Sequence, residues 1–566
     1  MKAVRSILFV LGLLVLLVYR LRRHILASIM RLPPVMYRVR LEEGLRVPVG
    51  GGLALAADHY SPAAPGSYPT ILIRSPYGRC KKAGAFGWLL NFAAFRFAER
   101  GYHVVIQDTR GRFESGGVFD PYFNERDDGL ATLDWLAAQP WYNGVVGLWG
   151  SSYLGIAQWV IADAPPVRAL VPSITGSQLQ TIVYPDGALD LSLALRWLAI
   201  FRALDRGKNL LHGLRLLLSI ERSINPAYAS LPIIESDQAA LGEAVPFFRK
   251  WLSHAGPDDR LWLDVHEKTR PESAAAPVHL IGGWYDFFLR TTLSDYAALQ
   301  AAGRQPYLTI GPWHHFSEII SLYDLREGIR WFDAHLKGKP ETIRSKPVRV
   351  YVMGANEWRE MDIWPPLARQ TPYYLHAGQH LNHELPAEHE AADHYCYNPA
   401  DPTPMVGGAQ FSPLAGPRDN RALEARPDVL IFSTAPLNEP VEIIGPVRLQ
   451  LYAGSSLDCA DFFGRLCDVY PDGRSMNICD GLFRIKPGRI KRQPDGSFCI
   501  EIDMWATAYR FKAGHRIRLQ VSSGAHPRWS RNLGTGDCLN GTDMQAAAQT
   551  IYHDSRHPSA LLLPVI

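Results

Sequence analysis

The sequence predicts an α/β fold in which a parallel sheet covered by helices is interrupted by a helical insertion and followed by an antiparallel β domain. Three observations carry this prediction. Continuous apolar runs alternate with helical patterns at residues 37–172 and again at 271–347, as in a parallel sheet covered on both faces. A stretch rich in Leu, Ala and Arg with helical spacing separates these two parts at 173–270. From residue 348 to 566, short alternating runs replace the helices.

Residues 1–36 precede these elements and contain an unbroken apolar run, ILFVLGLLVLLVY, at 7–19. Its thirteen residues are fewer than the roughly 20 that span a bilayer, and this length is typical of a signal-peptide core. However, the basic segment RLRRH follows the run, no clear A-x-A cleavage site is present, and residues 25–30 are largely apolar again. We therefore expect an uncleaved N-terminal anchor that associates with a membrane through residues 7–30. The alternatives are a secreted or periplasmic protein and a cytoplasmic one.

The first sheet region alternates strand patterns with helical spacing. Strands are expected at 70–74, 102–107, 145–149 and 168–171, and helices at 94–100, at 130–137 and between 149 and the stop at Pro165. After the insertion the pattern resumes with strands at 278–281 and 307–310 and a helix at 291–302. An insertion between sheet strands is where a cap over a substrate site is expected.

The C-terminal region predicts an antiparallel sandwich or jelly roll. Its alternating runs include VRVYVM (348–353), VRLQLYA (447–453), CIEIDM (499–504) and HRIRLQVSS (515–523). Turn signals of the form Pro-Asp-Gly separate such runs at 471–473 and 494–496. Because helical patterns nearly vanish here, this region is expected to form a domain of its own.

The composition of the chain restricts the partners that it can be expected to bind. The chain has 566 residues, 20% of them charged, and a net charge of +4, so no nucleic-acid partner is expected. The seven cysteines include no C-x-x-C pair, which argues against a zinc or redox site and favours buried free thiols. No cofactor or metal is expected, and the oligomeric state is left open.

Three residues of the types that acyl transfer requires follow apolar runs in the order Ser, Asp, His. Ser152 follows VVGLW, Asp286 follows VHLI, and His315 follows YLTI. Doubly wound hydrolases carry nucleophile, acid and base in this order, beyond the ends of sheet strands. Each residue alone also has a structural explanation, as a turn serine, a capping aspartate or a packed histidine. Neither Ser151 nor Ser152 fits the common Gly-x-Ser-x-Gly elbow.

Several separated segments resemble the cocaine esterase / X-prolyl dipeptidyl-peptidase family of serine hydrolases (the CocE/NonD type). The matching stretches are IRSPYGR (73–79), DTRGRFESGG (108–117), GSSYLGIAQW (150–159), GGWYDFF (282–288), GPWHH (311–315), DVYPDGRSMNICDG (468–481) and FKAGHRIRLQVSS (511–523). The resemblance spans roughly residues 40 to 560. It implies an α/β-hydrolase core with a helical cap insertion and a C-terminal jelly-roll domain.

The family resemblance also implies roles for individual residues. The family elbow reads Gly-x-Ser-Tyr-x-Gly, which makes Ser152 the nucleophile and Ser151 the variable residue before it. Asp286 is then the orienting acid and His315 the base, whereas His314 occupies a variable position. The oxyanion hole of the family would be formed by the backbone N–H of Tyr153 and the hydroxyl of Tyr77, the alternative for Tyr77 being a turn residue after Pro76. Arg110 is expected to pair with carboxylates structurally.

The residues after Asp286 bear on the substrate. Relatives that accept α-amino acyl groups place carboxylates there, but this chain has Phe287, Phe288 and Leu289. An ammonium would be left desolvated and unpaired, unless the cap supplies a carboxylate. Trp284 and Phe288, with the cap residues Tyr184 and Trp197, are candidates to bind an apolar or aromatic acyl group, and the alternative is that they are core residues.

The sequence therefore predicts a serine esterase that acts on a small-molecule ester through an acyl-serine intermediate. The first alternative is an X-prolyl dipeptidyl-peptidase or other amide hydrolase of the same family. Proline-specific relatives tend to be longer, and this chain shows no clear N-terminal helical domain. The second alternative is a non-catalytic protein whose jelly roll binds a carbohydrate or a partner, which the complete Ser-Asp-His set disfavours.

Overall fold

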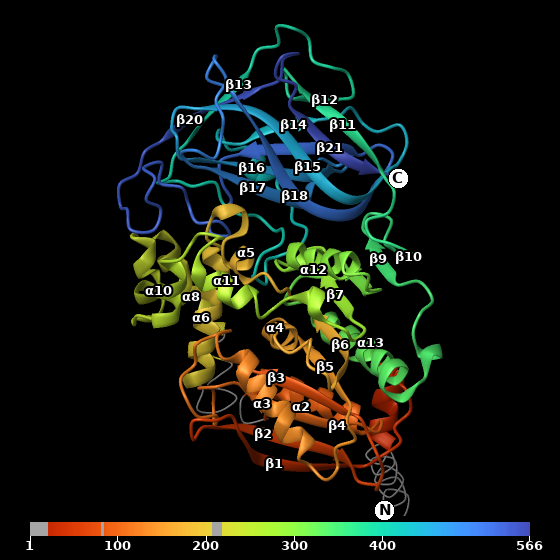
Figure 1. Cartoon of the computed structure of the whole chain (residues 1–566). Helices are drawn as coiled ribbons and strands as arrows, with labels where there is room; N and C mark the ends of the chain where they lie inside the picture. The colour runs from red at the N-terminus through yellow and green to blue at the C-terminus, as the bar shows by residue number, and fades with distance from the viewer. Residues whose placement is uncertain (1–20, 81–83, 207–214, 216–217) are drawn as a thin grey trace, which may run out of the picture. The chain divides into compact units, whose positions relative to one another are not determined.

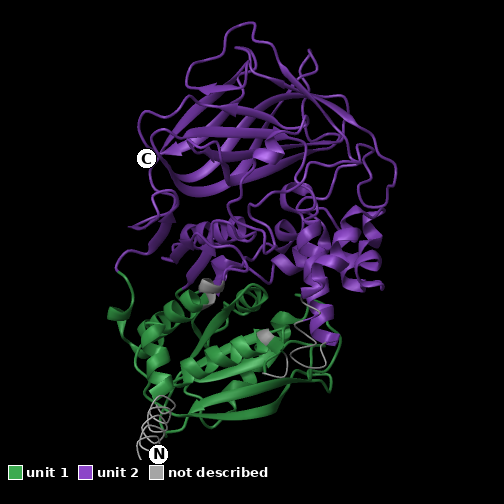
Figure 2. Cartoon of the chain, turned by 180° about the vertical axis from the view of Figure 1, so that it is seen from behind, with its two compact units in different colours: residues 1–171, 275–277, 318–344 green, residues 172–274, 278–317, 345–566 purple. Residues whose placement is uncertain are grey.

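A computed structural model describes residues 21–80, 84–206, 215 and 218–566 (Figure 1). The chain divides into two compact units, which Figure 2 distinguishes by colour. Unit 1 comprises residues 1–171, 275–277 and 318–344, and unit 2 comprises residues 172–274, 278–317 and 345–566.

The apolar run at 7–19, which carries most of the predicted anchor, lies outside the described residues. Residues 21–29, which follow it, are helical. Among the described residues, we find no helix with both the length and the apolar character needed to cross a membrane. The N-terminal anchor therefore stays a prediction.

The strands of unit 1 lie side by side in the order β1-β2-β4-β3-β5-β6. Their bounds are β1 (Val39–Pro48), β2 (Ala54–Pro62), β3 (Thr70–Ser75), β4 (His103–Asp108), β5 (Val146–Ser151) and β6 (Val167–Ser173), of which the last two residues of β6 belong to unit 2. Strand β3 pairs in parallel with β4 and β5, as the continuous apolar runs predict. Strands β1 and β2 add an antiparallel edge that the sequence pattern did not predict.

Helices cover both faces of this sheet. On one face, Phe97 of α2 (Gly84–Ala98) packs against Trp149 of β5 and Phe332 of α13 (Glu318–Lys337), with ring centroids 5.5 and 5.9 Å away. The other face carries α3 (Glu125–Ala137) and α4 (Tyr153–Trp159). There Gly129 of α3 lies so close to β3 that a Cβ would stand 2.9 Å from Nη1 of Arg74. Leu72 of β3 pairs with Leu148 of β5, and successive side chains of a strand point to opposite faces, so Arg74 and Trp149 lie on opposite faces of the sheet.

Residues 174–270 form the predicted helical insertion of unit 2, with helices and turns but no strand in its described part. The helices are α5 (Leu179–Val183), α6 (Leu191–Arg206), α8 (Ile220–Ala229), α9 (Ser236–Leu241), α10 (Pro246–Leu252) and α11 (Arg260–His266). Short 3-10 turns lie at η2 (Pro185–Gly187), η3 (Ile233–Glu235) and η4 (Pro271–Ser273).

A second run of parallel strands follows in unit 2. Strands β7 (His279–Gly283), β8 (Tyr307–Gly311) and β9 (Val348–Val352) pair in parallel, β10 (Glu357–Met361) pairs antiparallel with β9, and α12 (Leu289–Ala301) connects β7 to β8. The run VRVYVM therefore belongs to the α/β sheet, and its predicted place in the antiparallel domain was wrong. Strand β9 buries every second residue, so its pattern is the same as that of a sandwich strand.

The remaining strands of unit 2 form a second sheet that is almost entirely antiparallel. They are β11 (Arg369–His376), β12 (His380–Asn382), β13 (Asp393–Tyr397), β14 (Leu430–Ser433), β15 (Val441–Ser455), β16 (Ala460–Val469), β17 (Ser475–Ile485), β18 (Phe498–Phe511), β19 (Arg516–Ser522), β20 (Ala547–Tyr552) and β21 (Ala560–Val565). One short helix, α14 (Arg421–Glu424), interrupts them.

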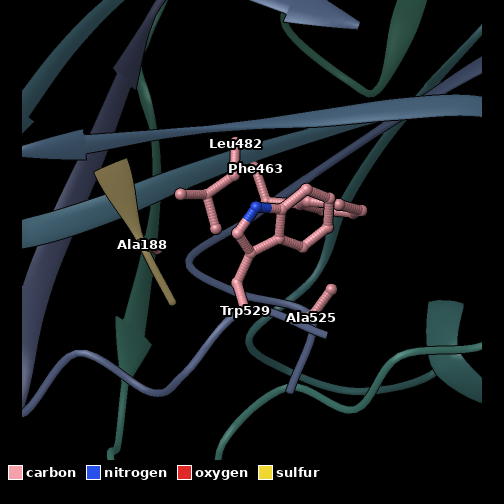
Figure 3. Close-up of a cluster of buried hydrophobic side chains, with 5 residues drawn as sticks. All are labelled: Ala188, Phe463, Leu482, Ala525 and Trp529. Atoms are coloured by element: carbon pink, nitrogen blue, oxygen red, sulfur yellow. The ribbon is translucent and has the colours of Figure 1, made fainter. Parts of the chain in front are cut away.

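Within unit 2, buried contacts join the helical insertion to this β domain. Figure 3 shows Ala188 of the insertion packed in one cluster with Phe463, Leu482, Ala525 and Trp529. Beside the cluster residues, Arg290 of α12 pairs with Asp186 of η2 at 2.6 Å and with Asp503 of β18 at 3.0 Å. The chain therefore fixes its insertion against the β domain by both apolar and charged contacts.

All seven cysteines are free thiols. Cys467 and Cys479 are buried, as expected, whereas Cys396 and Cys499 are exposed and the other three are half-buried. The expectation of buried thiols therefore holds for only two of them. Cys396 and Cys499 lie in strands β13 and β18, where every second side chain faces outward, and the three half-buried cysteines lie in loops.

Candidate active site

The segment GSSYLG forms a sharp turn between a strand and a helix. Strand β5 ends at Ser151 and helix α4 begins at Tyr153, so Ser152 is the single residue between them. Its backbone angles, φ 58° and ψ −125°, lie where residues other than glycine are rarely found. Gly150 precedes it with φ 145°, and a Cβ there would lie 2.5 Å from Cβ of Leu154. A strained strand-to-helix turn of this kind presents the nucleophile in α/β-hydrolases.

Tyr153, the residue after the candidate nucleophile, is held by its side chain. The residue is 1% exposed, and its hydroxyl donates to Oε1 of Glu125 over 2.7 Å. The backbone N–H of Tyr122 donates to the same hydroxyl oxygen over 3.2 Å. Burial, followed by the charge of Glu125, raises the pKa of Tyr153, so its phenol stays protonated. These contacts fix the start of α4.

Tyr77 lies in the loop after β3, and several contacts hold this loop. The ring of Tyr77 stacks on Phe86 with centroids 5.3 Å apart, and its backbone N–H donates to Oγ of Ser75. Arg112 donates to the carbonyl of Pro76 over 3.0 Å. Arg79, two residues after Tyr77, forms ion pairs with three carboxylates, those of Asp58, Asp108 and Glu114. Tyr77 is therefore a fixed and largely buried residue.

Asp286 and His315, which follow β7 and β8 of unit 2, are hydrogen-bonded. Nδ1 of His315 donates to Oδ2 of Asp286 over 2.8 Å. The other oxygen of the same carboxylate accepts the backbone N–H of Phe288 over 2.8 Å, and Asp286 is fully buried. A buried carboxylate on Nδ1 fixes both the orientation and the tautomer of an imidazole.

The loops that carry these two residues continue the pairing of their strands. The backbone N–H of Trp284 donates to the carbonyl of Gly311, and that of Tyr285 donates to the carbonyl of Trp313. A Cβ on Gly283 would lie 2.4 Å from the carbonyl oxygen of Trp313. The glycines at the strand ends therefore allow the close approach that brings Asp286 to His315.

The neighbouring His314 has a different environment. Its Nδ1 accepts the backbone N–H of Phe316 over 3.3 Å, and its own N–H donates to Oγ of Ser317. Burial lowers its pKa, against the opposing charge of Asp286. The hydrogen bond to Asp286 belongs to His315, the histidine that the family pattern selects.

Four phenylalanine rings contact the ring of His315. Ring centroids lie 4.7 Å away for Phe287, 5.7 Å for Phe288, 5.1 Å for Phe411 and 6.0 Å for Phe316. The sequence singled out Phe288 among them. It did not indicate Phe411, which comes from a loop of the β domain 96 positions after His315 and carries no local signal of this role.

The other candidate substrate residue, Trp284, is packed elsewhere. It is 3% exposed, its indole N–H donates to the carbonyl of Tyr351 in β9, and its ring lies 5.6 Å from Trp364. In the insertion, Trp197 stacks on Trp251 and the hydroxyl of Tyr184 donates to the carbonyl of Leu252. These positions favour the packing role that the sequence left open for these three aromatic residues.

Arg110 contacts a carboxylate, as expected. Its Nε donates to Oδ2 of the buried Asp128 over 3.1 Å. No group of three or more His, Cys, Asp or Glu side chains is arranged to hold a metal ion within the described parts of the chain.

Comparison with known proteins decides the family. The chain is 33% identical to cocaine esterase from Rhodococcus sp. (strain MB1 Bresler), over 92% of its own length and 97% of that protein. It belongs to the cocaine esterase / X-prolyl dipeptidyl-peptidase family. Residues 51–317 match the X-Pro dipeptidyl-peptidase (S15) family, and residues 342–562 match the X-Pro dipeptidyl-peptidase C-terminal non-catalytic domain. The chain is therefore a serine hydrolase of the cocaine esterase / X-prolyl dipeptidyl-peptidase family.

Solved structures support the fold of this family. An α-amino acid ester hydrolase superposes with a TM-score of 0.78 at 23% identity, covering 93% of this chain and 97% of that one. An aminopeptidase from the marine sediment archaeon Thaumarchaeota archaeon also gives 0.78 at 22% identity, covering 94% and 96%. The predicted α/β-hydrolase core with a helical cap and a C-terminal β domain is confirmed.

Proposed function

We propose that this serine hydrolase cleaves carboxylic esters through an acyl intermediate on Ser152, with His315 as base and Asp286 as the group that orients it. The hydroxyl of Ser152 attacks the ester carbonyl while Nε2 of His315 takes its proton. The same nitrogen then returns the proton to the leaving alcohol. Water, activated by His315, attacks the acyl-serine and releases the carboxylic acid and free Ser152.

One observation carries this proposal, the 2.8 Å hydrogen bond from Nδ1 of His315 to the buried carboxylate of Asp286. The bond places the imidazole proton on Nδ1, so Nε2 is the nitrogen with a lone pair for the serine proton. When His315 becomes positively charged, the carboxylate stabilises that charge in a site of low dielectric. The strained backbone at Ser152 supports the assignment of the nucleophile.

The oxyanion of the tetrahedral intermediate needs donors that are already in place. We assign this role to the backbone N–H of Tyr153 and the hydroxyl of Tyr77. The loop of Tyr77 is held by Arg79 and Arg112, and the side chain of Tyr153 by Glu125, so neither donor has to be ordered during the reaction. Loss of one such donor typically costs about 10²–10³ in rate.

The four phenylalanines around His315 favour an acyl group that is apolar or aromatic. Phe287 and Phe288 are 7% and 4% exposed and follow directly after Asp286. A charged α-ammonium placed against these rings would lose its water and find no carboxylate among the residues that directly follow Asp286. We therefore propose esters without an α-amino group as substrates.

The second candidate function is the release of X-Pro dipeptides from the N-terminus of peptides, which the family matches of both domains favour. Purified enzyme is assayed with p-nitrophenyl acetate, butyrate and benzoate, and with Gly-Pro-p-nitroanilide, using Ser152→Ala as the background. We expect kcat/KM to be at least about 100-fold higher for the best ester, since an apolar site leaves the dipeptide ammonium unpaired. A kcat/KM for Gly-Pro-p-nitroanilide equal to that of the best ester would establish the peptidase instead.

The apolar run at 7–19, flanked by basic residues, supports the further proposal that residues 7–30 attach this enzyme to a membrane. Cell fractionation of the full chain and of a chain without residues 1–30 tests it. We expect only the full chain in the membrane fraction, resistant to high salt. Recovery of both chains in the supernatant would contradict the anchor.

A further inference from the structure

Beneath the turn of Ser152, three buried side chains of unit 1 form a continuous chain of polar contacts, which we call the Arg74–Glu125–Tyr153 bridge. Oε1 of Glu125 accepts the hydroxyl of Tyr153 over 2.7 Å, and Oε2 lies 2.8 Å from Nη2 of Arg74. The contact between Nη2 of Arg74 and Oε2 of Glu125 is an ion pair, and neither of these two atoms forms a hydrogen bond within the described residues. Arg74 also donates from Nη1 to the carbonyl of Glu125 over 2.6 Å. The three residues are 3%, 4% and 1% exposed.

Because the bridge residues are buried, their polar groups need the contacts within the bridge in place of water. Desolvation raises the pKa of Glu125, and the charge of Arg74 acts in the opposite direction. A buried charge whose partner is removed is strongly destabilising, so the two side chains hold each other in place. The ring of Tyr122 stacks on the ring of Tyr153, with centroids 5.0 Å apart. The bridge therefore has little freedom to rearrange.

One end of the bridge belongs to a residue proposed to supply an oxyanion donor, and the other end lies three residues before the second such residue in the sequence. Tyr153 belongs to the bridge through its hydroxyl, and its backbone N–H is the first donor. Arg74 is on β3, three residues before Tyr77, whose hydroxyl is the second donor. Glu125, the first residue of α3, connects the end of β3 to the beginning of α4. It is the only bridge residue that contacts both others.

We propose that Glu125 is a positioning residue that sets the two oxyanion donors of the active site relative to each other. The proposal rests on the function proposed above, since it assumes that Tyr77 and Tyr153 bind the oxyanion. Glu125 itself touches no reacting atom. Its carboxylate fixes the side chain of Tyr153 on one side and Arg74 on the other, and thereby the backbone that carries each donor.

The test compares an oxygen ester with the thionoester in which sulfur replaces the carbonyl oxygen. A sulfur anion is larger and a poorer hydrogen-bond acceptor, so an intact oxyanion hole prefers the oxygen substrate. Glu125→Gln keeps the shape and removes the charge, and Tyr153→Phe removes only the hydroxyl. We expect each variant to lower kcat/KM about 10- to 100-fold on the oxygen ester, as expected for donors displaced by up to about 1 Å. On the thionoester we expect each variant to lower kcat/KM by less than about threefold.

The matched control is Asp128→Asn, which breaks a neighbouring buried ion pair of α3 with Arg110. This variant is expected to leave the preference for oxygen over sulfur unchanged, even where it lowers stability. Tyr153→Phe keeps the ring packing, so it carries the test if Glu125→Gln does not fold. We also expect the double variant to lose no more than the more affected single variant, since both changes break the same bridge.

The outcomes separate the two proposals. The role of Glu125 would be overturned if both single variants kept the wild-type preference for the oxygen ester over the thionoester, or if kcat/KM fell equally on the two esters. The esterase assignment would then remain intact. A wild-type enzyme without preference for the oxygen ester would overturn the proposed oxyanion hole, and the role of Glu125 with it.

Discussion

His315 donates from Nδ1 to Oδ2 of Asp286 over 2.8 Å, and the second oxygen of that carboxylate is held by the backbone N–H of Phe288. The pair therefore has one geometry, fixed by the loops after β7 and β8. It links two residues that lie 29 positions apart in the sequence and that act together only if the strands that precede them are neighbours.

The two adjacent histidines are expected to respond differently to replacement. His315→Ala removes the proposed base, and we expect kcat for p-nitrophenyl butyrate to fall about 10⁴-fold or more. His314→Ala removes a ring that hydrogen-bonds to the backbone N–H of Phe316, and we expect kcat to stay within about tenfold of the wild-type value. Steady-state kinetics measure kcat for both variants and show which histidine is the base. Equal losses at the two positions would contradict the assignment of His315.

Asp286→Asn keeps the size of the side chain and removes its charge. Because the imidazole then loses its fixed tautomer, we expect kcat to fall about 10⁴-fold with little change in KM. Thermal unfolding serves as the control, since the same side chain also accepts the N–H of Phe288. A folded Asn variant with more than about a tenth of the wild-type kcat would show that Asp286 does not orient the base.

Phe411 is expected to influence the choice of acyl group, because its ring contacts both His315 and Phe287. Phe411→Leu keeps an apolar side chain but removes the aromatic edge. We expect the ratio of kcat/KM for p-nitrophenyl benzoate over acetate to fall about 5- to 20-fold. Val118→Leu, at a position that is 80% exposed, is the control and should leave the ratio unchanged. An unaltered ratio in Phe411→Leu would place this ring outside the acyl site.

A buried histidine pair in unit 1 makes stability depend on pH. His59 and His103 share a hydrogen bond of 2.9 Å, and burial lowers the pKa of each to about 4. In the unfolded chain the imidazoles titrate near 6.5. As pH falls from 6.5 to 4, the unfolded state takes up protons that the folded state does not, so the stability present above pH 6.5 is lost.

The variant His103→Gln isolates this effect. Between pH 7 and pH 4.5 we expect the free energy of unfolding of the wild type to fall by about 2 kcal/mol more than that of the variant. Urea denaturation at the two pH values measures the difference. Parallel changes in the two proteins would show that His103 is not buried in its neutral form.

Part of this site could be predicted from sequence, because the chemistry follows apolar runs that are long enough to identify parallel strands. Asp286 and His315 each come after such a run, and they are hydrogen-bonded where the parallel strands β7 and β8 end. Ser152 also follows such a run, and its role as nucleophile stays a prediction. Strand β9 was assigned to the wrong sheet because it buries alternate residues, as a strand of an antiparallel sandwich does. Its pairing with β8 depends on contacts between segments that are distant in the sequence.

The aromatic environment of His315 shows a second limit. Phe411 contacts His315 through the packing of the β domain, and nothing near it in the sequence indicates this contact. Trp284 shows the reverse case. It lies in the same sequence motif as Asp286, yet its indole N–H donates to the carbonyl of Tyr351 in β9. Proximity in sequence to a reactive group therefore accounts for Phe287, Phe288 and Phe316 beside His315, but it does not account for Phe411. The Arg74–Glu125–Tyr153 bridge likewise joins segments that are distant in sequence.

Covalent labelling with a fluorophosphonate, followed by mass spectrometry of the modified peptide, identifies the nucleophile of this enzyme. We expect one modified residue, Ser152, and no labelling of the Ser152→Ala variant, while Ser151→Ala is labelled as the wild type is. Labelling that persists in Ser152→Ala, or a modified peptide that assigns the probe to Ser151, would contradict the assignment of Ser152 as the nucleophile.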